Sequence, residues 1–275
     1  MTSQTPRITF IGGGNMARSL IGGLVRAGTR GTDIAVAEPN ANLRTALAHD
    51  FGIATFDSGS DAAQGVDAIV FAVKPQVMKT VCASLRDIVQ AHKPLVVSIA
   101  AGIRIDQIDA WLGGDVAVVR AMPNTPALIG AGAAGLVANV RTDARQRELA
   151  QRILDAAGLA VWITDEALMD TVTALSGSGP AYFFLLVEAL EDAAVAQGMP
   201  REAARALVTQ TCLGAGRMLR EEGEAPAELR RRVTSPNGTT QAAVESFEAD
   251  GLRAVAARAI AAATKRGQEL SAQPD

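Results

Sequence analysis

The stretch that most constrains the fold is "ITFIGGGNMARSLIGGLVRAG", residues 8–28. An apolar strand pattern passes through glycines into a helical pattern and contains G-x-G-x-x-A at Gly12, Gly14 and Ala17. Gly12 allows the tight turn, Gly14 lets the backbone approach a pyrophosphate, and Ala17 permits close packing of helix on sheet. Phosphates bind at such helix N-termini, so we expect this loop, including Asn15 and Met16, to bind a dinucleotide. The alternative is a purely structural glycine turn.

Short apolar runs alternate with helical patterns up to about residue 163. The runs are "RITFIG", "DIAVAE", "DAIVFAV", "PLVVSIA", "VAVVRAM", "AAGLVA" and "LAVWIT". Continuous Val/Ile/Leu runs separated by helices are typical of a parallel sheet that is covered on both faces. The sequence therefore predicts an α/β protein whose N-terminal domain, residues 1–164, is a Rossmann-type doubly wound parallel sheet.

Loops follow several of these strand patterns. At the strand ends stand Glu38, Lys74 with Pro75, Ala100 and Asn124. In open α/β sheets ligands bind at the carboxyl ends of strands, so we expect these positions to line a cofactor cleft, although ordinary turns would explain any one of them. A carboxylate at Glu38 suits the ribose hydroxyls of NAD, whereas Arg44 could meet the 2′-phosphate of NADP. Either cofactor therefore remains open.

After Thr164 the strand patterns stop. Helical periodicity continues over residues 165–175, 180–197, 201–221, 225–233, 239–249 and 252–270. We therefore predict an all-α domain over 165–275, starting with a helix capped by Thr164 or Asp165. Its helices, such as "AYFFLLVEALEDAAVAQG", are apolar on more than one side, which indicates a dimer interface or, alternatively, a compact internal core.

The composition excludes several kinds of protein. A net charge of -3 and 4% aromatic residues give no basic or stacking surface for nucleic acid. Cys82 and Cys212 lie in helical patterns and are interpreted as two buried free thiols, and His49 and His92 as surface residues, so no metal site is expected. The N-terminus "MTSQTPRITF" has no signal-peptide layout, and no apolar run is long enough to span a membrane. We therefore expect a cytoplasmic protein.

The helical half has one conspicuous polar loop, "TSPNGTT" at residues 234–240, and it holds no acid or base. No lysine lies between residues 94 and 264, and no histidine follows His92. Oxidising an alcohol requires a base, whereas a protonated imine accepts hydride directly. A helix N-terminus capped by Thr239 or Ser235 could hold a substrate carboxylate. The loop therefore favours a small anionic imine, with a plain capped connection as the alternative.

Taken together, these stretches resemble pyrroline-5-carboxylate reductase over almost the whole chain. The matching segments are "FIGGGNMA", "AVKPQ", "SIAAGI", "RAMPNTPALIGAG", "ALSGSGPAYFF" and "VTSPNGTTQAAVESFE". The resemblance implies reduction of 1-pyrroline-5-carboxylate to L-proline by NADPH or NADH, the last step of proline biosynthesis. It also implies a helical dimerisation domain, substrate bound at the interface of two subunits, and assembly up to a decamer of five dimers.

The resemblance also assigns roles to residues. Thr240 would face the ring nitrogen as the catalytic hydroxyl, and the substrate carboxylate would lie in the loop that contains Ser235, Asn237, Gly238 and Thr239. Gly177, Ser178 and Pro180 would shape a helix break near the nicotinamide, with Ser178 at the substrate. Asn237 stands where many relatives carry Gly, and Glu38 where relatives carry a small hydroxyl residue. Two other hypotheses are a Rossmann-type alcohol dehydrogenase and a non-catalytic dinucleotide-binding module.

Overall fold

The computed structural model describes residues 5–272, so the first four residues of the N-terminal stretch and the last three of the chain lie outside it. One sheet has the strand order β3-β2-β1-β4-β5-β6-β7-β8. Its strands are β1 (Ile8–Ile11), β2 (Ile34–Ala37), β3 (Ala54–Phe56), β4 (Ala68–Phe71), β5 (Leu95–Ser98), β6 (Val118–Met122), β7 (Gly132–Ala138) and β8 (Gly158–Trp162). All seven runs expected as strands are strands, which confirms the α/β fold class.

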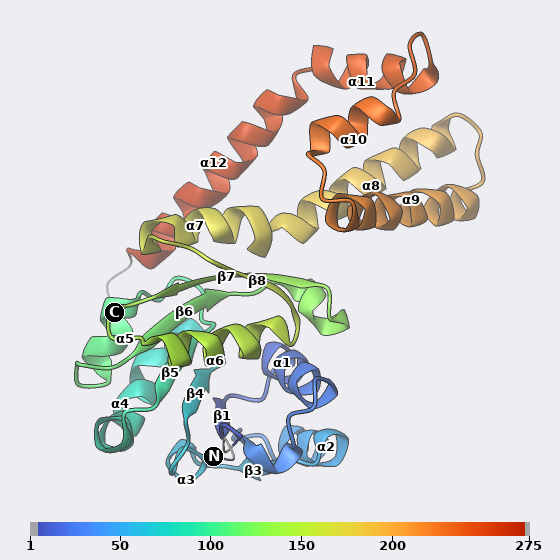
Figure 1. Ribbon diagram of the computed structural model, residues 1–275. Coiled ribbons are helices and arrows are strands. Elements are labelled where there is room, and N and C mark those ends of the chain that lie inside the picture. Colours follow the sequence, from blue (N-terminus) through green and yellow to red (C-terminus); the bar gives the residue numbers. More distant parts are fainter. Residues whose placement is uncertain (1–4, 273–275) are drawn as a thin grey trace. The chain divides into compact units, whose positions relative to one another are not determined.

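Helices connect the strands and cover both faces of the sheet (Figure 1). They are α1 (Asn15–Arg26), α2 (Ala41–Phe51), α3 (Gly59–Ala62), α4 (Pro75–His92), α5 (Ile105–Trp111) and α6 (Ala144–Asp155). Side chains alternate across each strand, so Phe10 and Val70 enter the core beneath α1, α2 and α6, whereas Ile11 and Phe71 enter the core beneath α3, α4 and α5. Two apolar cores therefore lie on either side of one sheet.

The sheet departs from the prediction at two places. β7 runs antiparallel to β6, because residues 123–131 join them by a short connection instead of the long crossover that a parallel pair needs. β3 was not predicted, because it is a three-residue edge strand whose side chains are at most half-buried. The remaining neighbouring strands are parallel.

The part after β8 is helical, as predicted. It begins with a 3-10 turn (Glu166–Leu168), α7 (Met169–Val172) and a π-helical turn (Thr173–Gly177). It continues with α8 (Gly179–Ala196), α9 (Arg201–Glu221), α10 (Pro226–Arg232), α11 (Thr239–Ala249) and α12 (Leu252–Ser271). Asp165 caps the first turn by accepting a hydrogen bond from the Ala167 N–H at 2.9 Å, as expected.

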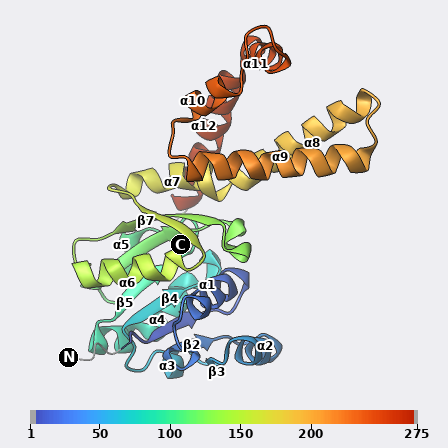
Figure 2. The ribbon, with the colours of Figure 1, turned by 45° about the vertical axis from the view of Figure 1, so that its right-hand side comes forward.

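The chain forms two compact units, which we describe separately. The first comprises the residues up to Ser178 together with the stretch from Ala263, and the second comprises residues Gly179–Ala262. In the second unit α8 and α9 lie side by side as an antiparallel pair (Figure 2). The last turns of α12 return to the first unit, where the Ser271 hydroxyl donates to the Asp170 carboxylate at 3.2 Å.

The second unit buries little of its apolar surface within one chain. Of its described residues, Gly179, Glu191, Ala204 and Leu229 are buried. Large apolar side chains on α8 are exposed by 41–68%: Phe183, Phe184, Leu185, Leu186 and Leu190. An exposed apolar surface of this kind is typical of an interaction face.

The two cysteines differ. Cys82 on α4 is buried as expected, and this burial raises the pKa of its thiol to about 12. The prediction that Cys212 is buried is wrong for the single chain, because α9 buries little more than Ala204 and leaves Cys212 exposed. His49 and His92 are exposed, as expected. None of the helices described here is long and apolar enough to cross a membrane.

Candidate active site

The glycine loop after β1 makes the close approach that its sequence predicts. Gly12 has φ of 100°, and a Cβ placed there would lie 2.7 Å from the Ala72 carbonyl oxygen at the end of β4. Gly14 caps α1 without a side chain, and a Cβ added there would meet nothing within 4 Å. Ala17 is buried against the sheet. Gly12 therefore shapes the turn. Gly14 leaves the N-terminus of α1 accessible to a phosphate.

Glu38 lies next to this loop, at the carboxyl end of β2. Its carboxylate accepts hydrogen bonds from the Gly13 N–H and from the Asn40 N–H, each at 2.9 Å. A Cβ added to Gly13 would lie 3.2 Å from the Glu38 side chain, so the two residues are in close contact. The sequence did not single out Gly13, because its bond to Glu38 depends on how two loops meet. Glu38 is thus fixed beside the phosphate loop.

The other expected cofactor positions follow strands of the same parallel edge. Lys74 caps α4 at its N-terminus, with Pro75 in the first helical position, and its exposed ammonium has no partner among the described residues. Ala100 follows β5 and is buried, and its N–H donates to the Ser98 hydroxyl at 3.3 Å. Asn15 and Met16 open α1, exposed and half-buried respectively.

Asn124 follows β6, but its amide group already has partners in the protein. Its Nδ2 donates to the Ser176 carbonyl oxygen at 2.9 Å, and its Oδ1 accepts from the Ala133 N–H at 2.8 Å. The residue as a whole is 9% exposed. Cofactor contact by Asn124 stays a prediction, whereas its role in joining three segments of the first unit was not visible in the sequence.

These positions suit a dinucleotide. Parallel pairing aligns the carboxyl ends of β2, β1, β4 and β5, so Glu38, Gly12, Lys74 and Ala100 lie along one edge of the sheet. The strand order changes direction beside β1, which is where ligands bind in open α/β sheets. An open helix N-terminus and an acidic group beside it match the pyrophosphate and the adenosine ribose of NAD(P).

The polar loop of the second unit opens α11, and its cap differs from the prediction. Gly238, not Thr239 or Ser235, is the N-cap, because it takes the extended conformation that precedes Thr239 while its N–H donates to the Ser235 carbonyl oxygen at 3.1 Å. Asn237 has φ of 58°, a left-handed conformation that Asn and Gly tolerate best, which explains its position. Its N–H donates to Gln241 Oε1 at 2.7 Å.

A glycine cap leaves donors free in this loop. No side chain of the described residues caps the first turn of α11, so its leading N–H groups face outward. The hydroxyls of Ser235, Thr239 and Thr240 make no hydrogen bond within the described chain, and all three residues are exposed. The arrangement offers backbone and hydroxyl donors and a positive helix end, which together suit a carboxylate.

The segment before α8 contains the expected helix break. The Ser178 N–H donates to the Thr173 carbonyl oxygen at 2.8 Å, which closes the π-helical turn, and Pro180 is the second residue of α8. A Cβ on Gly177 would lie 3.0 Å from Met122 Cε at the end of β6. π-Helical turns are rare and are frequent at functional sites.

The helical part contains no histidine and one lysine, Lys265, so its candidate bases are carboxylates. Glu188 is exposed, and Glu191 is buried between Arg201 and Arg205, which hold the pKa of its carboxyl below the usual range. The described residues contain no group of His, Cys, Asp and Glu that could hold a metal ion. The arrangement therefore favours chemistry that needs positioned donors more than a general base.

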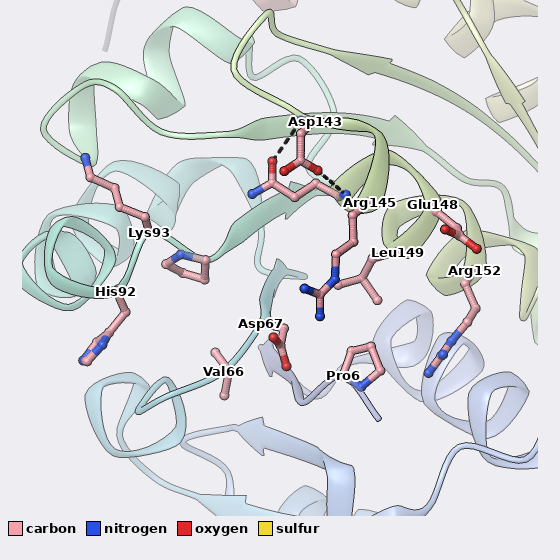
Figure 3. Close-up of a pocket in the computed structure, with 12 residues that line it drawn as sticks. Pro6, Val66, Asp67, His92, Lys93, Asp143, Arg145, Glu148, Leu149 and Arg152 are labelled. Carbon is pink, nitrogen blue, oxygen red and sulfur yellow. Dashed lines mark hydrogen bonds between the residues drawn. The ribbon is translucent and has the colours of Figure 1, made fainter. Parts of the chain in front are cut away.

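A cavity of about 420 Å³ lies elsewhere in the first unit (Figure 3). Its lining includes Pro6, Asp67 and Pro94, which precede β1, β4 and β5, so it lies at the amino edge of the sheet. Charges of both signs line it, among them Arg145 and Glu148. This edge is opposite to the one that carries Gly12 and Glu38.

Comparison with known proteins identifies the family. Residues 166–270 match the family model for pyrroline-5-carboxylate reductase dimerisation, and residues 7–102 match the model described as NADP oxidoreductase coenzyme F420-dependent. The chain is 51% identical to a pyrroline-5-carboxylate reductase of Pseudomonas aeruginosa, covering 98% of each chain. It is 42% identical to that of Haemophilus influenzae, covering 97% of this chain and 98% of the relative.

Solved structures agree with this assignment. A pyrroline-5-carboxylate reductase from Coxiella burnetii matches with a TM-score of 0.96 and 42% identity over 98% of this chain and 100% of that one. The Plasmodium falciparum pyrroline carboxylate reductase, solved with NADP bound, matches with a TM-score of 0.82 and 27% identity over 98% of this chain and 99% of that one. The chain belongs to the pyrroline-5-carboxylate reductase family.

Proposed function

We propose that this protein reduces 1-pyrroline-5-carboxylate to L-proline with NADPH or NADH, as the final step of proline biosynthesis. The observation that carries the proposal is the N-terminus of α11, which no side chain caps: its N–H groups and the nearby hydroxyls are free, with no acid or base in the loop. The names of its relatives support the same reaction. An imine substrate needs positioned donors, because it can enter already protonated.

In the first unit, the residues along the carboxyl edge would hold the dinucleotide. The N-terminus of α1, with Gly12, Gly14, Asn15, Met16 and Ala17, would bind the pyrophosphate. The adenosine ribose would lie at Glu38. Four further residues would line the rest of the cofactor: Lys74, Pro75, Ala100 and Asn124. When bound, NAD(P)H supplies the hydride that reduces the C=N bond.

In the second unit, the loop before α11 would bind the substrate. The free N–H groups of its first turn and the Ser235 and Thr239 hydroxyls would hold the carboxylate, with Asn237 and Gly238 setting the turn. Thr240 would donate its hydroxyl hydrogen bond to the ring nitrogen of the product amine, or accept one from the iminium N–H. Ser178, which belongs to the first unit, is proposed as a substrate-binding residue on the resemblance to the family alone. Orientation of this kind lowers the barrier by fixing a near-attack geometry.

We also propose that the protein works as a homodimer in the cytoplasm, with its dimerisation domain over residues 165–275 following a dinucleotide-binding domain over 1–164. The match of residues 166–270 to the dimerisation model supports the boundary. The exposed apolar side chains of α8 support the dimer, because a monomer would leave them in water. Further assembly into a decamer of five dimers is part of the same proposal.

The test is an assay of the purified full chain with pyrroline-5-carboxylate and either NADH or NADPH, following the loss of reduced nicotinamide absorbance and the appearance of proline. Turnover with proline formation supports the reductase. Binding of the cofactor without turnover would contradict it and would favour a six-membered cyclic imine or a binding module. Light scattering after size-exclusion chromatography measures the assembly, and a monomer would contradict the proposed dimer.

A further inference from the structure

The carboxylate of Glu38 accepts two backbone hydrogen bonds beside the glycine loop that follows β1. One oxygen accepts from the Gly13 N–H and the other from the Asn40 N–H, both at 2.9 Å. A carboxylate has about four lone-pair positions, so each oxygen can still accept from a hydroxyl. The two ribose hydroxyls of an unphosphorylated adenosine can donate hydrogen bonds to the Glu38 carboxylate. A 2′-phosphate that is ionised at neutral pH has acceptor oxygens and no donor.

Two arginines, Arg18 on α1 and Arg44 on α2, make contacts within the protein. Arg44 Nη1 donates to the Glu38 carbonyl oxygen at 2.7 Å and to the Pro39 carbonyl oxygen at 2.8 Å. Arg18 pairs with Asp50 and lies over the Phe51 ring. Residues 39–43, "PNANL", carry no positive charge. A 2′-phosphate at the end of β2 would therefore meet a fixed negative charge.

We propose that this protein prefers NADH to NADPH, and that Glu38 sets the preference. The inference rests on the proposed use of a nicotinamide dinucleotide at this edge. Like charges brought together at an interface oppose binding, so the carboxylate discriminates against the 2′-phosphate. The preference sets this chain apart from the Plasmodium falciparum relative, whose structure holds NADP.

The experiment is a fluorescence titration of the full-length protein with NADH and, separately, with NADPH in the absence of any imine. We expect Kd for NADH to be at least about tenfold lower than Kd for NADPH. Glu38→Ser should reduce this ratio at least about tenfold, mainly through tighter NADPH binding. Glu38→Asp keeps the charge and should keep the preference for NADH.

A matched control removes a negative charge elsewhere. Asp87 lies exposed on α4, and its carboxylate makes no hydrogen bond or ion pair in the described chain, so Asp87→Ser should leave the ratio unchanged. If Glu38→Ser does not fold, Glu38→Gln keeps the side-chain length and tests the same charge. Ratios of kcat/KM for the two cofactors with pyrroline-5-carboxylate should follow the ratios of Kd.

Three results would overturn the inference. They are equal or tighter NADPH binding by the unchanged protein, an unchanged ratio in both uncharged variants, and a loss of preference in Glu38→Asp as large as in Glu38→Ser. The titrations contain no substrate, so they are independent of the proposed reaction. An absence of turnover with either cofactor would contradict the reductase activity, while the two Kd values would still decide the role of Glu38.

Discussion

Asn124 Nδ2 donates a hydrogen bond to the Ser176 carbonyl oxygen at 2.9 Å, and this bond ties the end of β6 to the π-helical turn before α8. The same side chain accepts from the Ala133 N–H. A mostly buried amide that satisfies both segments fixes the conformation of the turn, since leaving either backbone group unpaired costs about 1–3 kcal/mol.

Asn124→Asp removes one of these two hydrogen bonds and keeps the other. The aspartate can still accept from Ala133, but it cannot donate to the Ser176 carbonyl, so we expect the free energy of unfolding to fall by about 1–3 kcal/mol. Urea denaturation followed by circular dichroism measures the change. Asn42→Asp, at an exposed position on α2, should change stability by less than about 0.5 kcal/mol. Equal effects at the two positions would show that the bond to Ser176 does not matter.

Removing Arg120 or Glu166 from their ion pair should lower the free energy of unfolding by different amounts. Arg120 Nη1 lies 3.0 Å from Glu166 Oε1, and the side chains are 6% and 27% exposed respectively. Glu166→Gln leaves a buried guanidinium uncompensated and should lower the free energy of unfolding by about 3 kcal/mol or more. Arg120→Met should cost less, because Glu166 can reach water. Urea denaturation of both variants checks the order, and a larger loss in Arg120→Met would contradict it.

A surface pair serves as the control for that comparison. Arg266 Nη1 lies 2.9 Å from Glu269 Oε2 on α12, and both side chains are well exposed. Glu269→Gln should change stability by less than about 1 kcal/mol, as exposed ion pairs generally do.

Thr240→Ala should lower kcat by about ten- to a thousandfold, comparable to the loss of one positioned donor, or about 1.4–4 kcal/mol. The free hydroxyl of Thr240 and its exposed position at the start of α11 motivate this expectation. Thr240→Ser keeps the hydroxyl and should recover most of the activity. Steady-state kinetics with pyrroline-5-carboxylate measures both, and wild-type turnover in Thr240→Ala would remove Thr240 from the proposed site.

Glu191 should make stability depend on pH. Hydrogen bonds from Arg205 and then Arg201 lower the pKa of its carboxyl below the ordinary 4.5. Because the folded pKa lies below the unfolded one, this carboxylate stabilises the protein above pH 4.5 and loses that contribution as the pH falls through 4.5 toward the folded pKa. The difference in urea midpoint between the wild-type protein and Glu191→Gln should therefore shrink between about pH 7 and about pH 3.5.

Glu188 provides the matched control on the same helix. It is exposed and has no hydrogen-bond partner in the described chain. Glu188→Gln should change the urea midpoint little at either pH. A pH-dependent difference as large as that of Glu191→Gln would show that the two arginines are not its source.

The sequence predicted the local elements well because their signals are local. The glycine loop, the seven apolar runs and the aspartate cap depend on neighbouring residues, and each has the expected structure. The antiparallel β7 was not predictable from its apolar content, since direction depends on the length of the connection. β3 lacked a pattern because an edge strand buries little.

For the site residues too, the sequence predicted the features that depend on neighbouring residues and missed those that depend on distant contacts. The position of Glu38 at the end of β2 follows from its place in the sequence, but its bond to Gly13 depends on how two loops meet. The Gly238 cap was missed because propensity favours a hydroxyl at an N-cap, whereas this turn leaves the helix end open. The prediction that Cys212 is buried was wrong for a different reason. An apolar helical pattern does not show whether the chain itself covers that face of the helix.

The return of α12 to the first unit bears on the order in which the protein can be completed during synthesis. Residues from Ala263 onward belong to the unit that begins at the N-terminus, with Ser271 bonded to Asp170 and its carbonyl oxygen accepting from Arg104 at 3.4 Å. On the ribosome, the sheet can form early, since domains generally fold from the N-terminus. Its final contacts must wait until the whole helical segment has been translated, so the unit that starts to fold first is finished last.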